Sequence, residues 1–169
     1  MADVLIVMSG LPGTGKSTVS RELARQLGGC LVRIDTIEQA IGRARDDEQP
    51  VGAAGYVVAY AVAEDQLRLG LTVVADSVNP VAATREAWRD VARRTGSCVV
   101  DVEVVCSDAR EHRNRVDTRS SDIADLRLPT WDEVLRGNYE RWDREHVVVD
   151  TASRDVAQCV AQLRAAAGI

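Results

Sequence analysis

The chain has 169 residues, of which 46% are hydrophobic and 28% are charged, and its formal net charge at pH 7 is −5. This length suits one domain with its own core, predicted to span residues 1–169. The acidic balance argues against broad, sequence-independent nucleic-acid binding, and the apolar runs are too short to span a membrane.

The cysteines Cys30, Cys98, Cys106 and Cys159 lie far apart and form no C-x-x-C pair. This spacing favours neither a metal site nor a disulfide framework. Unpaired thiols are typical of a reducing compartment, so we expect a cytoplasmic protein.

The chain begins with an apolar run, Val4–Met8, which predicts a buried strand, and a glycine-rich loop then leads into a predicted helix, Lys16–Leu27. The loop fits the phosphate-binding pattern G-x-x-x-x-G-K-[ST]. Its glycines let successive N–H groups point at one anion, and the helix adds the positive end of its dipole. The residues expected to bind nucleotide phosphates are Gly10, Leu11, Pro12, Gly13, Thr14, Gly15, Lys16, Ser17 and Thr18.

Lys16 is the only lysine among the 21 Lys and Arg residues of the chain. A compact ammonium on a flexible stem reaches the β- and γ-phosphates as a point charge, whereas a planar guanidinium needs a different geometry. The hydroxyl of Ser17 is placed to bind Mg²⁺. The motif therefore predicts binding of ATP with Mg²⁺, and the lack of an NKxD-type motif argues against GTP.

Strand-like and helical runs alternate along the rest of the chain. The predicted strands are Cys30–Ile34, Leu71–Ala75, Cys98–Val105 and His146–Val149. The predicted helices are Thr36–Arg45, Ala53–Leu69, Val81–Thr95, Asp108–Asp117, Thr130–Arg141 and Arg154–Ala167. Such alternation predicts an α/β fold with a parallel sheet covered by helices on both faces, and ligands gather at the carboxyl ends of its strands.

Two carboxylates follow predicted strands. Asp35, after the second strand, would lie across from the glycine loop and could accept a proton from an attacking hydroxyl. It could also cap the next helix, and the two roles are compatible. Asp76 ends the apolar run Thr72–Ala75, as in a Walker B strand, and is the predicted Mg²⁺ ligand, directly or through water.

A polar segment from Thr118 to Pro129 is predicted to be a mobile flap, and arginines precede it. Arg115 and Arg119 would share a helix face if the helix continues, and arginines on a closing lid stabilise a transferring phosphoryl group. We therefore predict a lid at about 113–129 with these two arginines. Alternatively, Arg110, Arg113, Arg115 and Arg119 form a solvated face paired with Asp108, Glu111 and Asp117.

Other features receive no catalytic role. The segment Asp46–Pro50 is predicted to be an acidic loop, and 150–152 is expected near the adenine from its position alone. Aromatic residues at helical spacing usually pack in a core. We assign packing to Trp131, Tyr139 and Trp142, and no role to His112 and His146.

Nearly the whole chain resembles the small P-loop kinases related to the kinase domain of bacteriophage polynucleotide kinase, the zeta toxins and chloramphenicol phosphotransferase, and bacterial predicted kinases in particular. The resemblance rests on Ser9–Thr18, Ile34-Asp35, the run Val74–Pro80 leading to Arg85 and Trp88, and the arginines from Arg113 to Arg119. It implies an adenylate-kinase-like, three-layer P-loop fold with a five-stranded parallel sheet and γ-phosphate transfer from ATP to a hydroxyl. It also implies Asp35 as general base, Lys16 and Ser17 as ligands of phosphate and Mg²⁺, and Arg115 and Arg119 as lid arginines.

Thr36, Ile37 and Glu38 follow Asp35, where several relatives carry further polar or basic residues. An acidic Glu38 near the acceptor site favours a neutral or cationic acceptor over a phosphate-bearing one. The leading hypothesis is an O-phosphotransferase acting on a small molecule such as an antibiotic, nucleoside, sugar or other metabolite. The alternatives are a polynucleotide 5′-hydroxyl kinase, against which the acidic balance counts, and a regulatory ATPase without an acceptor.

Overall fold

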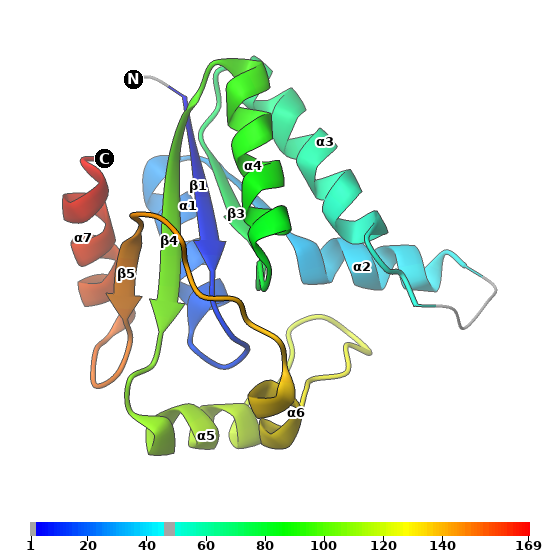
Figure 1. Ribbon diagram of the computed structural model, residues 1–169, viewed down its shortest axis with the longest axis vertical. Coiled ribbons are helices and arrows are strands. Elements are labelled where there is room, and N and C mark those ends of the chain that lie inside the picture. Colours follow the sequence, from blue (N-terminus) through cyan, green and yellow to red (C-terminus); the bar gives the residue numbers. More distant parts are fainter. Residues whose placement is uncertain (1–2, 46–49) are drawn as a thin grey trace.

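The computed structural model describes residues 3–45 and 50–169 and is built around a parallel sheet of five strands (Figure 1). The strands lie in the order β2-β3-β1-β4-β5, with β1 in the centre. All strand pairings are parallel, so the carboxyl ends of the strands lie at one edge of the sheet. The strands are β1 (Val4–Ser9), β2 (Cys30–Arg33), β3 (Val73–Asp76), β4 (Cys98–Val105) and β5 (Val147–Asp150).

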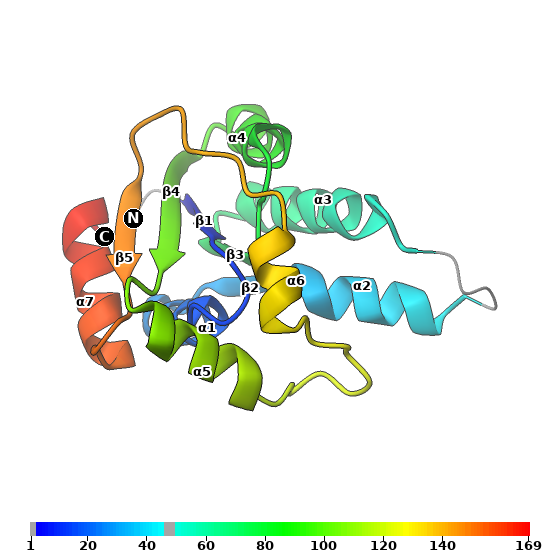
Figure 2. The same cartoon turned by 60° about the horizontal axis from the view of Figure 1, so that its bottom comes forward.

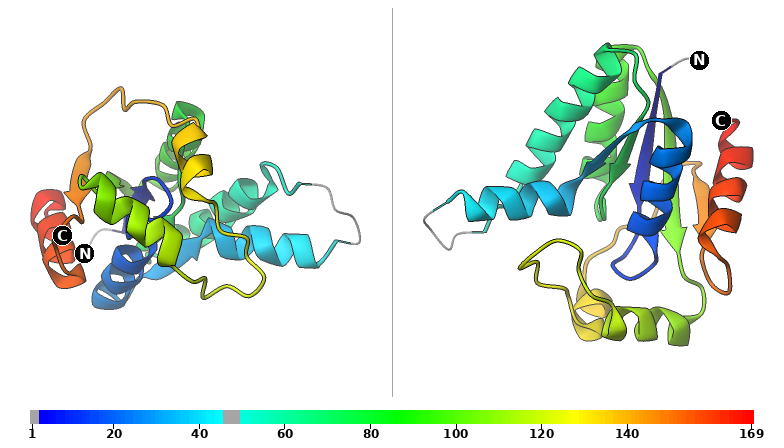
Figure 3. Two further views of the ribbon diagram at one scale, coloured as in Figure 1. Left: turned by 90° about the horizontal axis from the view of Figure 1, so that it is seen from below. Right: turned by 180° about the vertical axis from the view of Figure 1, so that it is seen from behind.

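Four helices cover the two faces of this sheet. Alternate residues of β1 point to opposite faces, so Leu5 and Val7 enter one hydrophobic core while Ile6 and Met8 enter the other. The helices α3 (Ala54–Arg68) and α4 (Ala82–Thr95) cover the first core, whereas α1 (Lys16–Leu27) and α7 (Val156–Ala167) cover the second (Figure 3). The predicted three-layer fold is confirmed.

The remaining helices lie toward the carboxyl edge of the sheet. They are α2 (Ile34–Arg43), α5 (Ala109–Thr118) and α6 (Trp131–Arg136). Figure 2 shows α5 and α6 lying across the ends of the strands, joined by residues 119–130, which form neither helix nor strand. We call residues 119–129 the flap. Within the described ranges, no helix combines the length and the apolar character needed to cross a membrane.

Most predicted elements agree with the structure within two residues at each end, but α6 does not. It was expected to reach Arg141 and instead ends at Arg136, because Gly137 adopts an extended conformation. The chain beyond it is held by Arg85, whose Nη2 donates to the carbonyl of Glu140 at 2.6 Å. Most of the predicted acidic loop, residues 46–49, lies outside the described residues.

Asn79 links strand β1 to helix α4 near the start of the glycine-rich loop. Its fully buried side chain donates to the Ser9 hydroxyl at 3.0 Å and accepts from the Trp88 indole at 3.1 Å. Its backbone has φ 48°, a conformation that Asn tolerates better than most residues.

We expect Asn79→Leu to lower the free energy of unfolding by about 3 kcal/mol, because it strands two buried polar groups and strains the backbone. Urea denaturation measures this change. The exposed Asn138→Leu is the matched control and should change stability by less than about 0.5 kcal/mol. Equal effects of the two substitutions would contradict the role of Asn79.

Candidate active site

The phosphate-binding loop passes so close to its neighbours that side chains are excluded. Gly10 has φ 140°, and a Cβ atom there would lie 2.3 Å from the carbonyl oxygen of Val104 in β4. Gly13 has φ 84°, and its Cβ would lie 2.4 Å from the side chain of Val116 in α5. The loop is therefore held between the sheet and α5 in one course that glycine alone permits.

Lys16 and Asp76 form a buried ion pair at the centre of the site. The Lys16 Nζ donates to Asp76 Oδ1 at 2.5 Å. Asp76 is the last residue of β3 and pairs with Met8 of β1, which places it beside the loop that follows β1. Its other oxygen, Oδ2, is buried without a hydrogen bond and lies 3.7 Å from the Nε of Arg33.

A cavity of about 490 Å³ lies between this loop, the start of α2 and the flap. Ten of the thirteen predicted site residues line it, among them Lys16, Ser17, Asp35, Arg115 and Arg119, whereas Gly10, Thr14 and Asp76 do not belong to its described lining. Six basic side chains and the carboxylates of Asp35 and Asp122 line the cavity, and three of the basic side chains are paired with carboxylates outside the lining. The basic residues are Lys16, Arg21, Arg33, Arg115, Arg119 and Arg127.

Asp35 is the second residue of α2 and lines the cavity. The residue at the N-cap is Arg33, and its side chain makes no capping hydrogen bond. The interpretation of Asp35 as an N-cap is therefore wrong, because the helix starts at Ile34, two residues earlier than a capping role requires. A carboxylate in the first turn still gains from the helix dipole.

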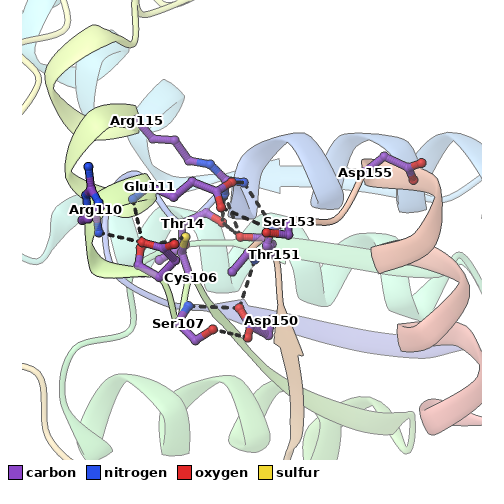
Figure 4. A network of polar contacts seen from close by, with 12 residues as sticks. Thr14, Cys106, Ser107, Arg110, Glu111, Arg115, Asp150, Thr151, Ser153 and Asp155 are labelled. Carbon is purple, nitrogen blue, oxygen red and sulfur yellow. Dashed lines mark hydrogen bonds and ion pairs between the residues drawn. The ribbon is translucent and has the colours of Figure 1, made fainter.

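The two predicted lid arginines have different surroundings. Arg115 is fully engaged: it donates to Glu111 at 2.5 Å and to the hydroxyl and carbonyl of Thr151 at 2.8 and 3.0 Å (Figure 4). In Arg119, Nε and Nη2 are buried without a hydrogen-bond partner. Burial lowers the pKa of Arg119, and the negative charge of Asp35 opposes this effect.

The two arginines do not share a helix face, because α5 ends at Thr118 and Arg119 is extended. Both side chains nevertheless line the cavity. Arg110 and Arg113 are exposed, and Arg113 pairs with Asp117 at 3.5 Å, so the solvated-face interpretation describes these two.

The flap is fastened over the cavity by ion pairs. Asp122 accepts from Arg21 of α1 at 2.5 Å and from Arg33 of β2 at 2.9 Å. Arg43 of α2 donates to the carbonyl of Ala124 and lies 3.6 Å from the carboxylate of Asp125. The hydrogen bond from Arg33 holds the pKa of Asp122 below its usual range, so the ion pairs of Asp122 persist at neutral pH.

Three residues at the site were given no specific role from the sequence, although Thr151 belongs to the segment 150–152 that was expected near the adenine from its position. Arg33 is the last residue of β2, so the strand-end rule that selects Asp35 could also have selected Arg33. His112 is buried against the glycine-rich loop, with Nε2 at 2.9 Å from the carbonyl oxygen of Pro12. Thr151 bonds both Arg115 and the carbonyl oxygen of Thr14 (Figure 4). No spacing pattern marks His112 or Thr151.

Glu38 lies in α2, three residues after Asp35. It packs against α3, where a Cβ on Gly55 would lie 2.3 Å from its Cγ, and it is not among the described residues that line the cavity. Burial raises the pKa of Glu38, and the nearby charge of Asp35 raises it further. Glu38 therefore carries little information about the charge of an acceptor.

Comparison with known proteins defines the class. A family model described as an AAA domain, AAA_33, matches residues 5–140, and the chain belongs to this family. It is 34% identical over 136 residues to a shikimate kinase of Corynebacterium efficiens, an alignment that covers 70% of this chain and 80% of the relative. The chain is a P-loop kinase, an ATP-dependent phosphotransferase that acts on a hydroxyl group of a small molecule.

Solved structures share the fold. A gluconokinase of Sinorhizobium meliloti superposes with a TM-score of 0.65 at 21% identity, covering 95% of this chain and 89% of that one. The APS kinase of Mycobacterium tuberculosis in complex with AMPPNP and APS gives a TM-score of 0.71 at 17% identity, with 99% and 96% of the two chains covered.

We expect Asp122→Asn to loosen the flap, because it removes the charge that holds Arg21 and Arg33. Hydrogen exchange of the flap amides should accelerate by about two- to fivefold, the range for exposed ion pairs, while exchange in β1 and β4 stays unchanged. Asp125→Asn is the control, because Asp125 is more exposed and its ion pair is longer. An unchanged flap in Asp122→Asn would show that these ion pairs do not hold it.

Proposed function

We propose that the chain transfers the γ-phosphate of ATP to a hydroxyl of a small anionic molecule, with Asp35 as general base. The observation that carries this proposal is the shared cavity: Asp35 lines the same space as Lys16 and the glycine-rich loop. Phosphoryl transfer to a hydroxyl requires a group that accepts the proton of the hydroxyl and a site that holds the phosphates. The carboxylate would supply the first and the loop the second.

The phosphates would bind the loop between β1 and α1. Lys16, paired with Asp76 in the structure, would turn its ammonium to the β- and γ-phosphates. The donor set fits Mg²⁺, because Asp76 Oδ2 is a buried oxygen without a hydrogen bond and the Ser17 hydroxyl lines the cavity. When bound, Mg²⁺ neutralises charge on the phosphate oxygens.

In the chemical step, Asp35 would accept a proton and the arginines would stabilise negative charge. Asp35 takes the proton of the acceptor hydroxyl as the oxygen bonds to the γ-phosphorus, and ADP leaves with the electrons of the broken P–O bond. Arg119 has two buried nitrogens without partners, and these can bind the oxygens of the transferring group. Arg115 is held by Glu111 and Thr151, so we assign it to orienting the nucleotide as part of a lid at 113–129.

The cavity favours an acceptor with a negative group. Although most of its basic side chains are paired with carboxylates, Arg33 and Arg119 have buried nitrogens without a hydrogen bond, and these can bind a negative group. Arg33 lies two residues from Asp35, and its Nε is buried without a hydrogen bond. This preference replaces the expectation of a neutral or cationic acceptor, which rested on Glu38. The kinases named above for shikimate and gluconate act on hydroxylated carboxylates, which supports the same class here.

The function is tested by label transfer from γ-labelled ATP in the presence of Mg²⁺. The acceptors are shikimate, gluconate and other hydroxylated carboxylates, their neutral polyol counterparts, chloramphenicol, and a 5′-hydroxyl oligonucleotide. We expect label on a carboxylate. Label on chloramphenicol or the oligonucleotide alone would instead support the narrower resemblance to the phosphotransferase or polynucleotide kinase group, and hydrolysis without transfer would favour a regulatory ATPase.

We expect Asp35→Asn to reduce kcat by ~10²- to 10⁴-fold, the range for loss of a general base, while ATP binding changes little. Glu38→Gln is the matched control, since it removes a neighbouring carboxylate outside the cavity and should retain most activity. Steady-state kinetics and isothermal titration with AMPPNP separate turnover from binding. Full turnover by Asp35→Asn would refute the base assignment.

We also propose a cytoplasmic location, because Cys30, Cys98, Cys106 and Cys159 are all free thiols in the structure.

A further inference from the structure

Two peptide planes of the glycine-rich loop are fixed from outside the cavity. In a planar trans peptide the C=O and the N–H point in opposite directions. The carbonyl of Pro12 and the amide of Gly13 belong to one such plane, and those of Thr14 and Gly15 to another. Each plane precedes a glycine with positive φ, Gly13 at 84° and Gly15 at 89°, so sterics alone restrain its orientation weakly.

His112 holds the first plane. Its Nε2 lies 2.9 Å from the Pro12 carbonyl oxygen, which can only accept, so this nitrogen carries the hydrogen. The ring is buried and lies edge-on to Trp131, with centroids 5.0 Å apart, and it also borders the space above Gly13. Because the carbonyl of Pro12 points toward His112 in α5, the N–H of Gly13 points in the opposite direction.

Thr151 holds the second plane from the loop after β5. Its hydroxyl accepts from Arg115 at 2.8 Å and donates to the Thr14 carbonyl at 2.7 Å, nearer than the alternative acceptor on Val105 at 3.1 Å (Figure 4). The backbone N–H of Thr151 is bonded to Val105, so the residue is anchored to β4. Because the carbonyl of Thr14 points toward Thr151, the N–H of Gly15 points away from Thr151.

We propose that His112 and Thr151 are positioning residues that aim the amides of Gly13 and Gly15 at the nucleotide phosphates. Both glycines line the cavity, and neither amide donates a hydrogen bond within the described residues. Preorganised N–H groups bind an anion without the free-energy cost of turning peptides during binding. The inference rests on the proposed nucleotide site and adds two residues to it that need not touch the nucleotide.

The test uses matched pairs of variants and tripolyphosphate as the probe, because this anion has no base or sugar. Thr151→Val removes the hydroxyl with little change of shape, and Thr151→Ser keeps it. His112→Leu removes the donor, and His112→Gln keeps a donor near Nε2. Isothermal titration should show tripolyphosphate binding weakened by roughly 3- to 10-fold in the Val and Leu variants and by less than about twofold in the Ser and Gln variants, the range for one hydrogen bond.

Amide NMR of the glycine-labelled protein assigns the effect to individual peptides. Tripolyphosphate should shift the Gly13 and Gly15 amide signals in the wild type, lose its effect on Gly13 in His112→Leu, and lose its effect on Gly15 in Thr151→Val. Equal affinity in all variants would overturn the inference, as would weaker binding of AMPPNP with unchanged binding of tripolyphosphate. The latter result would place these residues against the base.

Failure of the proposed nucleotide site is distinguishable from failure of this inference. If the wild type binds neither AMPPNP nor tripolyphosphate, both are overturned. If the wild type binds both and the variants match it, only the positioning role is overturned. The two residues lie on different elements, so loss of folding in one variant, seen in a thermal melt, leaves the other pair to decide.

Discussion

The buried ion pair between Lys16 and Asp76 is the interaction on which the arrangement of the site depends. It joins the glycine-rich loop to the end of β3, next to the central strand β1, where both side chains are almost inaccessible to water. A buried ion pair gains little net stability, because desolvation offsets most of the attraction. A charge pair in this position is better explained by a role in ligand binding. A bound phosphate can form the ion pair with the Lys16 ammonium, and the released Asp76 carboxylate can then bind a cation.

The arginines around this pair differ in how many of their nitrogens lack a hydrogen-bond partner. Arg21 and Arg33 are paired with the flap residue Asp122, although the Nε of Arg33 has no hydrogen bond, and Arg115 is paired with Glu111 and Thr151. Arg119 alone among these four has two buried nitrogens without a partner. An incompletely bonded buried guanidinium costs free energy, and such a cost is expected where the missing partner is a ligand. The flap thus closes with its own carboxylate over one end of the cavity and leaves a cation free at the other.

Local sequence signals predicted the framework, because hydrophobic periodicity and glycine spacing depend on short stretches of chain. The five strands, the helices around them and the position of Asp76 followed from these signals. The extent of α6 did not, because the chain beyond Gly137 is fixed by Arg85, more than fifty residues earlier. The contacts of His112 and Thr151 with the glycine-rich loop could not be predicted for the same reason: their partners Pro12 and Thr14 lie 100 and 137 residues away.

One helix connects the two halves of the site. From α5, His112 bonds Pro12, Val116 fills the space beside Gly13, and Arg115 reaches the carbonyl oxygen of Thr14. The flap begins where this helix ends, so the ion pairs of Asp122 and the orientation of the phosphate-binding amides both depend on how α5 is docked. Displacing the flap to admit an acceptor would therefore pull on the element that shapes the phosphate cradle. Because coupling free energies are reciprocal, if the docked α5 strengthens phosphate binding, then phosphate binding stabilises the docked α5 by the same amount.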